Sequence, residues 1–259
     1  MSPLFSIITV TYNASDTIGK TLASVAAQTF DDYEHLIIDG ASKDDTIRIV
    51  TDNSRPEKTK IVSEPDKGLY DAMNKGMDMA SGEYLLFLNS GDTLHSPDTL
   101  SHIANAIGEN NTPGIVYGQT DIVNSEGTKV ADRHLIAPPT LTYESFAEGM
   151  VVCHQAFVVL ARIASPYNLS YRYSADYEWC IRCLQHSRKN VYIDEPIADY
   201  LMEGLTTANR RKSLLERFRI MSKYYGTAPT VIRHLRFARR FLKRMRLERD
   251  IPSDNIQNQ

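Results

Sequence analysis

Three short polar segments each follow a run of apolar and β-branched residues; they are residues 11–13, 39–40 and 89–92. If those runs are parallel strands of one sheet, the segments meet in the crevice at the carboxyl ends of the strands, where open α/β sheets bind ligands. A turn is the simpler interpretation of any one segment, because Asp-Gly and Ser-Gly-Asp are common turn sequences. Together the segments favour a shared ligand site that includes Asp39 and Asp92.

The chain lacks the glycine-rich loops that commonly hold phosphates. No G-x-G-x-x-G follows the first predicted strand, and the sequence contains no P-loop. A nucleotide at the strand ends would therefore need another counter-charge for its phosphates. Asp92 with a divalent cation could supply it, because Mg²⁺-like ions are held by one or two carboxylates together with phosphate oxygens.

The first hundred residues alternate between strand and helix patterns, which predicts a mostly parallel sheet with helices packed on it. Strands are predicted at residues 5–11, 33–38, 61–62 and 83–88. The first helix has an apolar stripe of Ile18, Leu22 and Val25. Ser42 and Asp45 have the spacing of a capping box for the second helix.

The third helix has the clearest periodicity. Its apolar stripe consists of Leu69, Ala72, Met73, Gly76, Met77 and Ala80. Tyr70, Asp71 and Asn74 then lie on other faces, and Gly82 is the expected C-cap. Further along, residues 125–143 are typical of a loop or hairpin region that could cover an acceptor.

The composition is that of an ordinary globular protein of 259 residues, 42% hydrophobic and 24% charged. It excludes the disordered, collagen-like and disulfide-scaffold classes. The three cysteines are an odd number and suit a reducing compartment, and no second pair completes a zinc site with Cys180 and Cys183. No apolar run approaches the roughly 20 residues of a membrane span, and no signal peptide is recognisable. We therefore expect a cytoplasmic protein.

Charge is distributed unevenly along the chain. Residues 1–204 hold 15 Lys and Arg against 28 Asp and Glu, whereas residues 205–250 hold 14 against 3. Such asymmetry indicates a basic segment that meets an anionic surface. We expect a folded domain over residues 1–204 and a basic helical extension over residues 205–259.

The extension contains an amphipathic pattern. Its apolar stripe consists of Val231, Leu235, Ala238, Leu242 and Met245, and Arg and Lys residues fill most of the remaining surface. A basic amphipathic helix of this kind is typical of a peripheral membrane element. Two alternatives stay open, in which the stripe packs on the domain or on a second subunit of a homodimer. Nucleic acid is not an expected partner, because aromatic residues that could stack on bases are scarce in this segment.

Four segments of the chain, in order, resemble glycosyltransferase family 2. They are I-I-T-V-T-Y-N at 7–13, I-I-D-G-A-S-K-D-D-T at 37–46, S-E-P-D-K-G-L-Y-D-A-M-N-K-G at 63–76 and G-E-Y-L-L-F-L-N-S-G-D at 82–92. The chain is most similar to bacterial enzymes that build O-antigen, capsule or colanic-acid repeat units. The resemblance continues more weakly through residues 153–155 and 174–179, and after Gly204 it says little.

The resemblance implies a GT-A fold, an α/β domain that transfers a sugar from a nucleotide donor with inversion, usually with Mn²⁺ or Mg²⁺. By the same resemblance, Thr11 and Asp39 would contact the nucleoside, with Asp39 bonding an edge of the base. Lys67 and Asp71 would flank the nucleotide or the donor sugar.

The family's D-x-D element, which holds the metal and the diphosphate, is altered in this chain. Asn89 and Gly91 stand where the family commonly has acids. In this place Asn89 and Ser90 would contact the donor, and Asp92 is left as the anionic metal ligand. The departure implies weak metal binding, or an ion held mainly by the diphosphate.

In this family a short acidic motif on the acceptor side supplies the catalytic base, and Asp176 is the matching residue. A base must come within hydrogen-bond reach of the acceptor hydroxyl, directly or through one water. The structural alternative is that Ser174 caps a helix and Asp176 interacts with its macrodipole, and Glu178 is a neighbouring candidate on a different face. An isolated histidine such as His154 is more often a structural hydrogen-bonding residue, and Trp179 is better explained as core.

The sequence therefore predicts an inverting hexosyltransferase that uses a nucleotide-sugar, with UDP-sugars the first choice and GDP-sugars open. Its acceptor would be a polyprenyl diphosphate-linked oligosaccharide in bacterial surface polysaccharide assembly, at the cytoplasmic face of the inner membrane. The competing hypothesis is a catalytically silent nucleotide- or sugar-binding protein that retains the GT-A fold, because fold alone does not establish activity.

Overall fold

The computed structural model describes residues 2–202 and 210–249. The chain forms two compact units, Met1–Ser213 and Leu214–Gln259. The predicted domain boundary, between Gly204 and Leu205, lies outside the described residues and stays a prediction.

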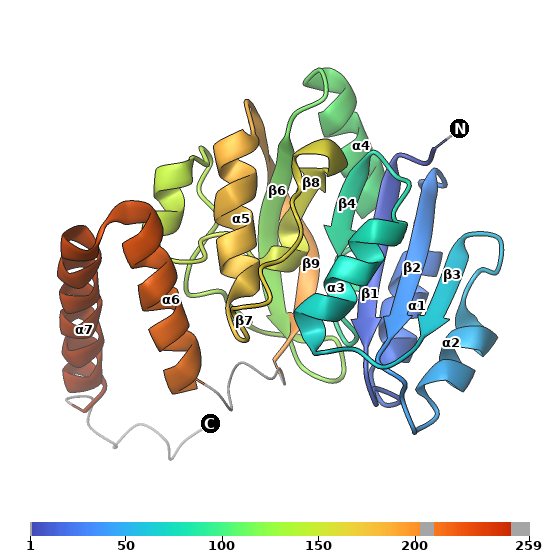
Figure 1. Cartoon of the computed structure of the whole chain (residues 1–259), viewed down its shortest axis with the longest axis horizontal. Helices are drawn as coiled ribbons and strands as arrows, with labels where there is room; N and C mark the ends of the chain where they lie inside the picture. Colours follow the sequence, from blue (N-terminus) through green and yellow to red (C-terminus); the bar gives the residue numbers. More distant parts are fainter. Residues whose placement is uncertain (1, 203–209, 250–259) are drawn as a thin grey trace, which may run out of the picture. The chain divides into compact units, whose positions relative to one another are not determined.

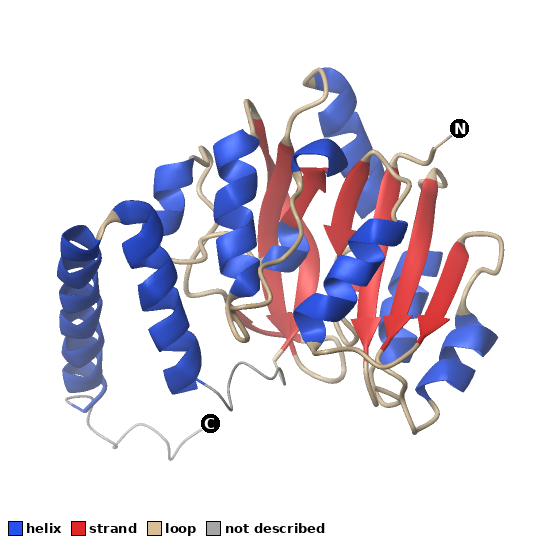
Figure 2. Ribbon diagram, viewed as in Figure 1, coloured by secondary structure: helices blue, strands red, loops and turns tan. Residues whose placement is uncertain are grey.

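The first unit is built on a mixed sheet, in which nine strands are described (Figure 2). The strands are β1 Phe5–Thr11, β2 Tyr33–Asp39, β3 Thr59–Ser63, β4 Tyr84–Phe87, β5 Thr93–Leu94, β6 Ile115–Val123, β7 Lys129–Asp132, β8 Phe157–Leu160 and β9 Asn190–Leu201. Their order is β3-β2-β1-β4-β8-β6-β9-β5, and β7 pairs with β6. The first four strands in this order are parallel, as are β6 and β9, whereas β8 runs antiparallel to β4 and β6. The first half of the sheet is therefore parallel, as predicted, and the second half is mixed.

Helices cover both faces of this sheet (Figure 1). They are α1 Ile18–Ala26, α2 Thr46–Asn53, α3 Leu69–Met79, α4 Thr99–Glu109 and α5 Ala175–His186, with short 3₁₀ turns η1 Tyr143–Glu148, η2 His154–Ala156 and η3 Ala161–Ile163. Helices α3 and α5 lie on one face, and α1, α2 and α4 lie on the other (Figure 1). Because both faces are covered, β1 and β2 are buried along their whole length, which explains their almost continuous apolar runs.

The apolar stripes position the helices against the sheet. Ile18 and Leu22 of α1 pack with Val50 of α2 in one buried cluster. On the other face, Gly76 brings α3 very close to β1, since a Cβ at this position would lie 2.4 Å from Ile8 Cγ2. A residue without a side chain is therefore needed at this crossing.

The predicted capping box at the start of α2 is wrong. Ser42 donates its hydroxyl to Asp39 Oδ1 at 2.5 Å instead of capping the helix. Helix α2 begins at Thr46, and Asp45 is its N-cap residue but makes no side-chain capping bond. The Ser42 hydroxyl therefore bonds to Asp39 at the end of β2 and not to the backbone of α2.

Two expectations about α3 are also corrected. Leu69 is 40% exposed, and Tyr70 is buried in its place with 7% exposed. The helix ends at Met79, with Ala80 rather than Gly82 as C-cap. Gly82 instead packs against β1, where a Cβ would lie 2.5 Å from the Ser6 backbone nitrogen.

The second unit contains most of α6 (Arg210–Tyr225) and α7 (Thr227–Arg249). Within it, the rings of Phe218 and His234 meet edge to face, with centroids 5.1 Å apart. Of the predicted apolar stripe, Val231 and Leu235 are exposed; the side chains of Ala238, Leu242 and Met245 lie outside the described part of the chain. Across residues 2–202 and 210–249, the helices are too short or too polar to traverse a bilayer.

Candidate functional site

The carboxyl ends of β1, β2 and β4 lie at one edge of the sheet and bring the three polar segments together (Figure 2). In the parallel register Thr11 pairs with Asp39, and Asp39 pairs with Ser63 of β3. The backbone N–H of Ser90 donates to the Val10 carbonyl at 3.3 Å, which places the third segment beside the end of β1. The structure therefore assembles the shared edge that the sequence predicts.

Asp39 is turned into the protein at this edge. Its carboxylate is fully buried and accepts bonds from the Ser42 backbone N–H at 2.9 Å, the Ser42 hydroxyl at 2.5 Å and the Ser63 hydroxyl at 2.6 Å. These bonds fix the loop after β2 against the end of β3. The two oxygens of a carboxylate offer about four acceptor positions, so a bond to a base edge would be an additional one. That contact stays a prediction.

Thr11 and Tyr12 offer two further features for a ligand. Thr11 Oγ1 is buried and has no hydrogen-bond partner among the described residues, and a buried polar atom in this state requires an explanation such as a missing ligand. The Tyr12 side chain is 60% exposed, and Gly40 lies against its ring, since a Cβ on Gly40 would be 3.2 Å from Tyr12 Cδ2. Tyr12 received no role from the sequence, although an aromatic residue at a strand end is a suitable surface for stacking a base.

Lys67 and Asp71 lie together at the N-terminus of α3, in the first turn and the loop before it. Asp71 Oδ2 accepts a bond from the Lys67 backbone N–H at 2.9 Å, and Asp66 Oδ1 accepts one from Gly68 at 2.8 Å. The Lys67 side chain is exposed. A cationic side chain next to a helix N-terminus suits an anionic ligand such as a diphosphate.

Asp92 is also turned inwards, and it links three segments of the first unit. Its side chain is almost fully buried, Oδ2 accepts from Gln155 Nε2 at 2.5 Å, and Oδ1 accepts from the Leu201 backbone N–H at 3.0 Å. Burial raises the pKa of Asp92 to about 7, while the bonds from Gln155 and Leu201 act in the opposite direction. The carboxylate thus binds donors of the protein itself, and a role as metal ligand would require it to release one of them.

Asn89 is the member of the altered D-x-D element that fits a cation. Its Oδ1 atom is buried and has no hydrogen-bond partner among the described residues. An amide oxygen is a hard ligand of the kind that Mg²⁺ and Mn²⁺ accept. The neighbouring Ser90 hydroxyl lies 3.4 Å from Thr17 Oγ1, so its contact with a donor stays a prediction.

A second group of possible metal ligands lies on β6 and β9 and directly after β5, and consists of Asp121, Asp199 and His95. His95 Nδ1 is 2.7 Å from Asp199 Oδ1. However, the Lys129 ammonium already lies 2.8 Å from Asp121 Oδ1. The positive charge that a cation would bring to Asp121 is therefore supplied by the chain.

Asp176 lies in the first turn of α5 and is partly exposed. The Tyr70 hydroxyl donates to Asp176 Oδ1 at 3.0 Å. Tyr70 is the neighbour of Asp71 in α3, so the structure brings the predicted base to the helix that also carries Lys67 and Asp71 at its start. The N-cap residue Ser174 makes no capping bond with its side chain, because its hydroxyl pairs with Ser213 at 3.1 Å.

The other candidates around Asp176 have structural roles. Glu178 is buried and pairs with Arg182 at 2.8 Å. The His154 ring is buried and shares a 2.5 Å bond with the Tyr167 hydroxyl; burial lowers the pKa of His154 to about 4, although the nearby charge of Asp176 raises it. Trp179 is fully buried, as expected of a core residue.

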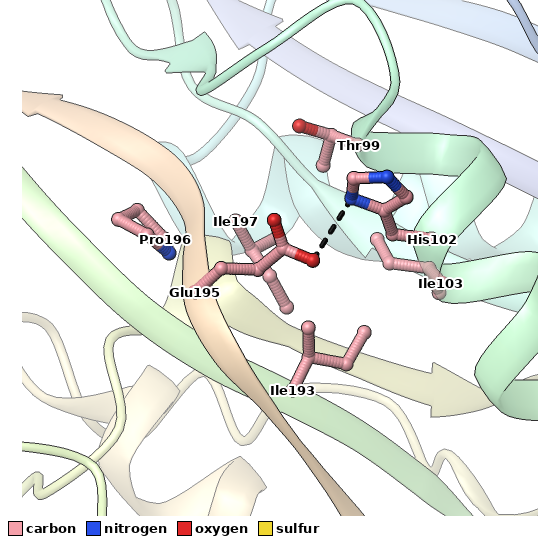
Figure 3. Close-up of a pocket in the computed structure, with 7 residues that line it drawn as sticks. All are labelled: Thr99, His102, Ile103, Ile193, Glu195, Pro196 and Ile197. Atoms are coloured by element: carbon pink, nitrogen blue, oxygen red, sulfur yellow. Dashed lines mark ion pairs between the residues drawn. The ribbon is translucent and has the colours of Figure 1, made fainter.

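A small pocket lies elsewhere, between α4 and β9 (Figure 3). Its lining residues are Thr99, His102, Ile103, Ile193, Glu195, Pro196 and Ile197. His102 and Glu195 form an ion pair of 2.9 Å across it. None of the predicted site residues lines it, so the strand-end edge remains the candidate site.

Comparison with known proteins decides the family. The model of "Glycosyl transferase family 2" matches residues 6–165. The chain belongs to glycosyltransferase family 2. This family 2 glycosyltransferase is 34% identical over 227 residues to a PGL/p-HBAD biosynthesis glycosyltransferase of Mycobacterium bovis, covering 83% of this chain and 84% of the relative. It is 31% identical over 212 residues to the amylovoran biosynthesis glycosyltransferase AmsB of Erwinia amylovora, covering 76% of this chain and 69% of the relative.

Solved structures of transferases share the fold of this family 2 glycosyltransferase. Residues 1–349 of S. aureus TarS superpose with a TM-score of 0.69 at 18% identity, covering 92% of this chain and 73% of that one. The mannosyltransferase PcManGT from Pyrobaculum calidifontis, solved with GDP-Man and Mn²⁺, gives 0.65 at 16% identity, covering 91% and 71%. At these identities the likeness establishes the GT-A fold and nothing finer.

Proposed function

We propose that this glycosyltransferase moves a hexose, with inversion at the anomeric carbon, from a nucleotide-sugar to a lipid-linked oligosaccharide. The observation that supports this most is the position of Asp176. Its partly exposed carboxylate bonds to Tyr70 at the start of α3, and the strand ends contribute unpartnered polar atoms of Thr11 and Asn89. A single displacement requires a nucleotide site together with a proton acceptor for the incoming hydroxyl.

In that displacement, the acceptor hydroxyl oxygen forms a bond to the anomeric carbon while the bond from that carbon to the nucleoside diphosphate breaks. The electron pair of the broken bond leaves on the diphosphate oxygen, and the hydroxyl proton passes to Asp176. Among the described residues, the Asp176 carboxylate accepts one side-chain hydrogen bond, from Tyr70. Acceptor positions on its oxygens therefore remain for an incoming hydroxyl.

The residues of the altered D-x-D element would hold a divalent cation together with the diphosphate. Asn89 offers an oxygen without a partner, and Asp92 would join it by releasing Gln155. When bound, Mn²⁺ or Mg²⁺ supplies positive charge that stabilises the leaving diphosphate. The exposed Lys67 adds a further positive charge at the start of α3.

The proposed donor is a UDP-sugar, with a GDP-sugar as the alternative. The solved neighbours support testing both, because TarS has been solved with UDP-GlcNAc and PcManGT with GDP-Man. Thr11, Tyr12 and Asp39 would hold the nucleoside.

The proposed acceptor is a polyprenyl diphosphate-linked saccharide of bacterial surface polysaccharide assembly, such as O-antigen or capsule. The name of the AmsB relative, which refers to amylovoran biosynthesis, supports it. We place the reaction at the cytoplasmic face of the inner membrane, with the basic extension in contact with anionic lipid.

The substitution Asp176→Asn tests the proposal. An amide cannot take up the acceptor proton, so turnover of UDP-glucose, UDP-galactose and GDP-mannose is expected to fall about a hundredfold or more. Binding of UDP or GDP, measured by titration calorimetry with and without Mn²⁺, is expected to stay at the wild-type affinity. Asp78→Asn, at an exposed acid of α3, is the matched control and should change neither quantity.

Each alternative has a distinct outcome. Unchanged turnover in Asp176→Asn would remove Asp176 as the base. A wild-type protein that binds a nucleotide but consumes no donor would favour the silent binding protein. If neither nucleotide binds with or without Mn²⁺, the donor site is wrongly assigned.

A further inference from the structure

Tyr70 is a buried tyrosine whose hydroxyl reaches Asp176 from another helix. The two residues are 106 positions apart, and the hydroxyl donates to Asp176 Oδ1 at 3.0 Å. The side chain is only 7% exposed, although the apolar periodicity of α3 left it on a polar face. The burial of Tyr70 therefore has a cause other than the apolar stripe of α3.

The Tyr70 ring is held by a column of stacked aromatic rings. It stacks on Tyr167 with centroids 5.6 Å apart, and Tyr167 stacks on Trp179 of α5 at 5.0 Å. Asn74, one turn after Tyr70 in α3, accepts a bond from the Tyr167 backbone N–H at 2.7 Å and donates to the Tyr167 carbonyl at 3.0 Å. The stacked rings and the bonds between Asn74 and Tyr167 thus hold the Tyr70 hydroxyl in place against Asp176.

The surroundings of Asp176 make this hydroxyl important. His154 from η2, Tyr167 and, on its own helix, Cys180 are the titratable groups that interact with its charge. Burial lowers the pKa of His154 to about 4, so His154 is neutral at pH 7, and burial raises the pKa of Tyr167 and Cys180. Among the described residues, no cation forms an ion pair with Asp176. The bond from Tyr70 is therefore the side-chain contact among the described residues that orients this carboxylate.

We propose that Tyr70 is a positioning residue, whose hydroxyl holds the Asp176 carboxylate in the orientation needed to accept the acceptor's proton. The inference rests on the proposed function, because it takes Asp176 as the base. Tyr70 itself need not contact either substrate.

Tyr70→Phe is the direct test, because it removes the hydroxyl and keeps a ring that can stack on Tyr167. Without this hydrogen bond the carboxylate is no longer held towards the acceptor hydroxyl, so we expect kcat to fall on the order of tenfold. The donor KM should stay within about twofold of wild type, because the nucleotide contacts are untouched. The matched control is Tyr84→Phe in β4. It removes a buried hydroxyl that donates to the Pro113 carbonyl at 2.7 Å, and it should leave kcat and the donor KM unchanged.

The double variant Tyr70→Phe/Asp176→Asn separates a role through Asp176 from a general loss of structure. If Tyr70 acts through the carboxylate, removing its hydroxyl should slow Asp176→Asn no further, because residues that act as a unit are not additive. An equal slowing in both backgrounds, or a Tyr70→Phe enzyme with wild-type kcat, would overturn the inference. The proposed function fails differently, since in that case the wild-type protein consumes no donor or Asp176→Asn is as active as wild type.

Discussion

At the scale of single residues, the acids of the strand-end motifs accept hydrogen bonds from the protein itself, in addition to any contact with a ligand. Asp39 bonds Ser63 from 24 positions away, and Asp92 bonds Leu201 from 109 positions away. Motif spacing could identify both acids in the sequence. It could not identify their donors, because the donors approach only after the sheet has formed.

Glu34 shows the same behaviour far from the strand-end edge, and it predicts a pH dependence of stability. The buried carboxylate is 2.8 Å from Lys60 Nζ and accepts bonds from the Ser6 hydroxyl and from Ser81. Burial by itself would raise its pKa, but the bonds from Lys60, Ser6 and Ser81 outweigh burial and lower it to about 2. Because this value lies below the ordinary 4.5, the stabilisation is present above pH 4.5 and is lost as the pH falls towards 2.

Glu34→Gln is expected to reduce the free energy of unfolding by about 2 kcal/mol at pH 7, since hydrogen bonds to a charged group are lost. Urea unfolding at pH 7, 4.5 and 3 measures this. The difference from wild type should shrink at the lowest pH, because Glu34 of the unfolded chain is protonated there, whereas the pKa of Glu34 in the folded protein is about 2. Glu109→Gln, at an exposed position, is the control. A difference that stays constant over this range would contradict the assignment.

At the scale of elements, α3 is the helix that joins the parts of the candidate site. Its first turn carries Asp71, Tyr70 contacts Asp176, and Gly76 sets its distance from β1. The position of the whole helix therefore matters for the chemistry proposed at its N-terminus.

Gly76→Ala is expected to lower the free energy of unfolding by about 1–3 kcal/mol, because the new methyl group would overlap the fully buried Ile8. Urea unfolding measures the effect. Gly108→Ala is the matched control: it is also a glycine in a helix, with no atom within 4 Å of a Cβ at that position, and alanine should stabilise α4 there by up to about 1 kcal/mol. Equal effects of the two substitutions would show that close packing at Gly76 is unimportant.

Most elements of the first ninety residues could be predicted, because their apolar runs are periodic, whereas the two-residue strand β5 (Thr93–Leu94) could not. The errors there arose where a polar side chain had a better partner than its local helix, as Ser42 did with Asp39. The second half could not be predicted to the same degree. Strands such as β8 are short and antiparallel, and β9 crosses back to pair with both β6 and β5, so their neighbours come from distant parts of the chain.

At the scale of the whole molecule, charge is distributed unevenly along the chain, and the first unit does not explain the basic C-terminal segment. Residues 205–250 hold 14 basic residues against 3 acidic ones. Helix α7 exposes Arg236 and Arg239 together with the apolar Val231 and Leu235. Exposed apolar and basic side chains on one helix are what an anionic membrane surface binds.

The full chain is expected to bind vesicles that contain phosphatidylglycerol and not to bind vesicles of phosphatidylcholine alone. Arg236→Glu with Arg239→Glu should weaken binding at least tenfold in a sedimentation assay, because each basic residue near the surface contributes about 1 kcal/mol. Lys20→Glu with Arg188→Glu makes the same charge change at exposed sites of the first unit and is the control. A chain that binds neither kind of vesicle but sediments as a dimer would favour the alternative in which the apolar stripe packs on a second subunit.

The paired bonds between Asn74 and the Tyr167 backbone limit how parts of related enzymes can be exchanged. Under the proposed function, an exchange of acceptor specificity between two family members would graft the segment after β8 together with helix α5, which carries Asp176. Here that graft would separate Tyr167 from Asn74 and Asp176 from Tyr70. A hybrid that keeps these contacts therefore has to take α3 together with α5, even though α3 lies among the segments that the sequence predicts to bind the donor.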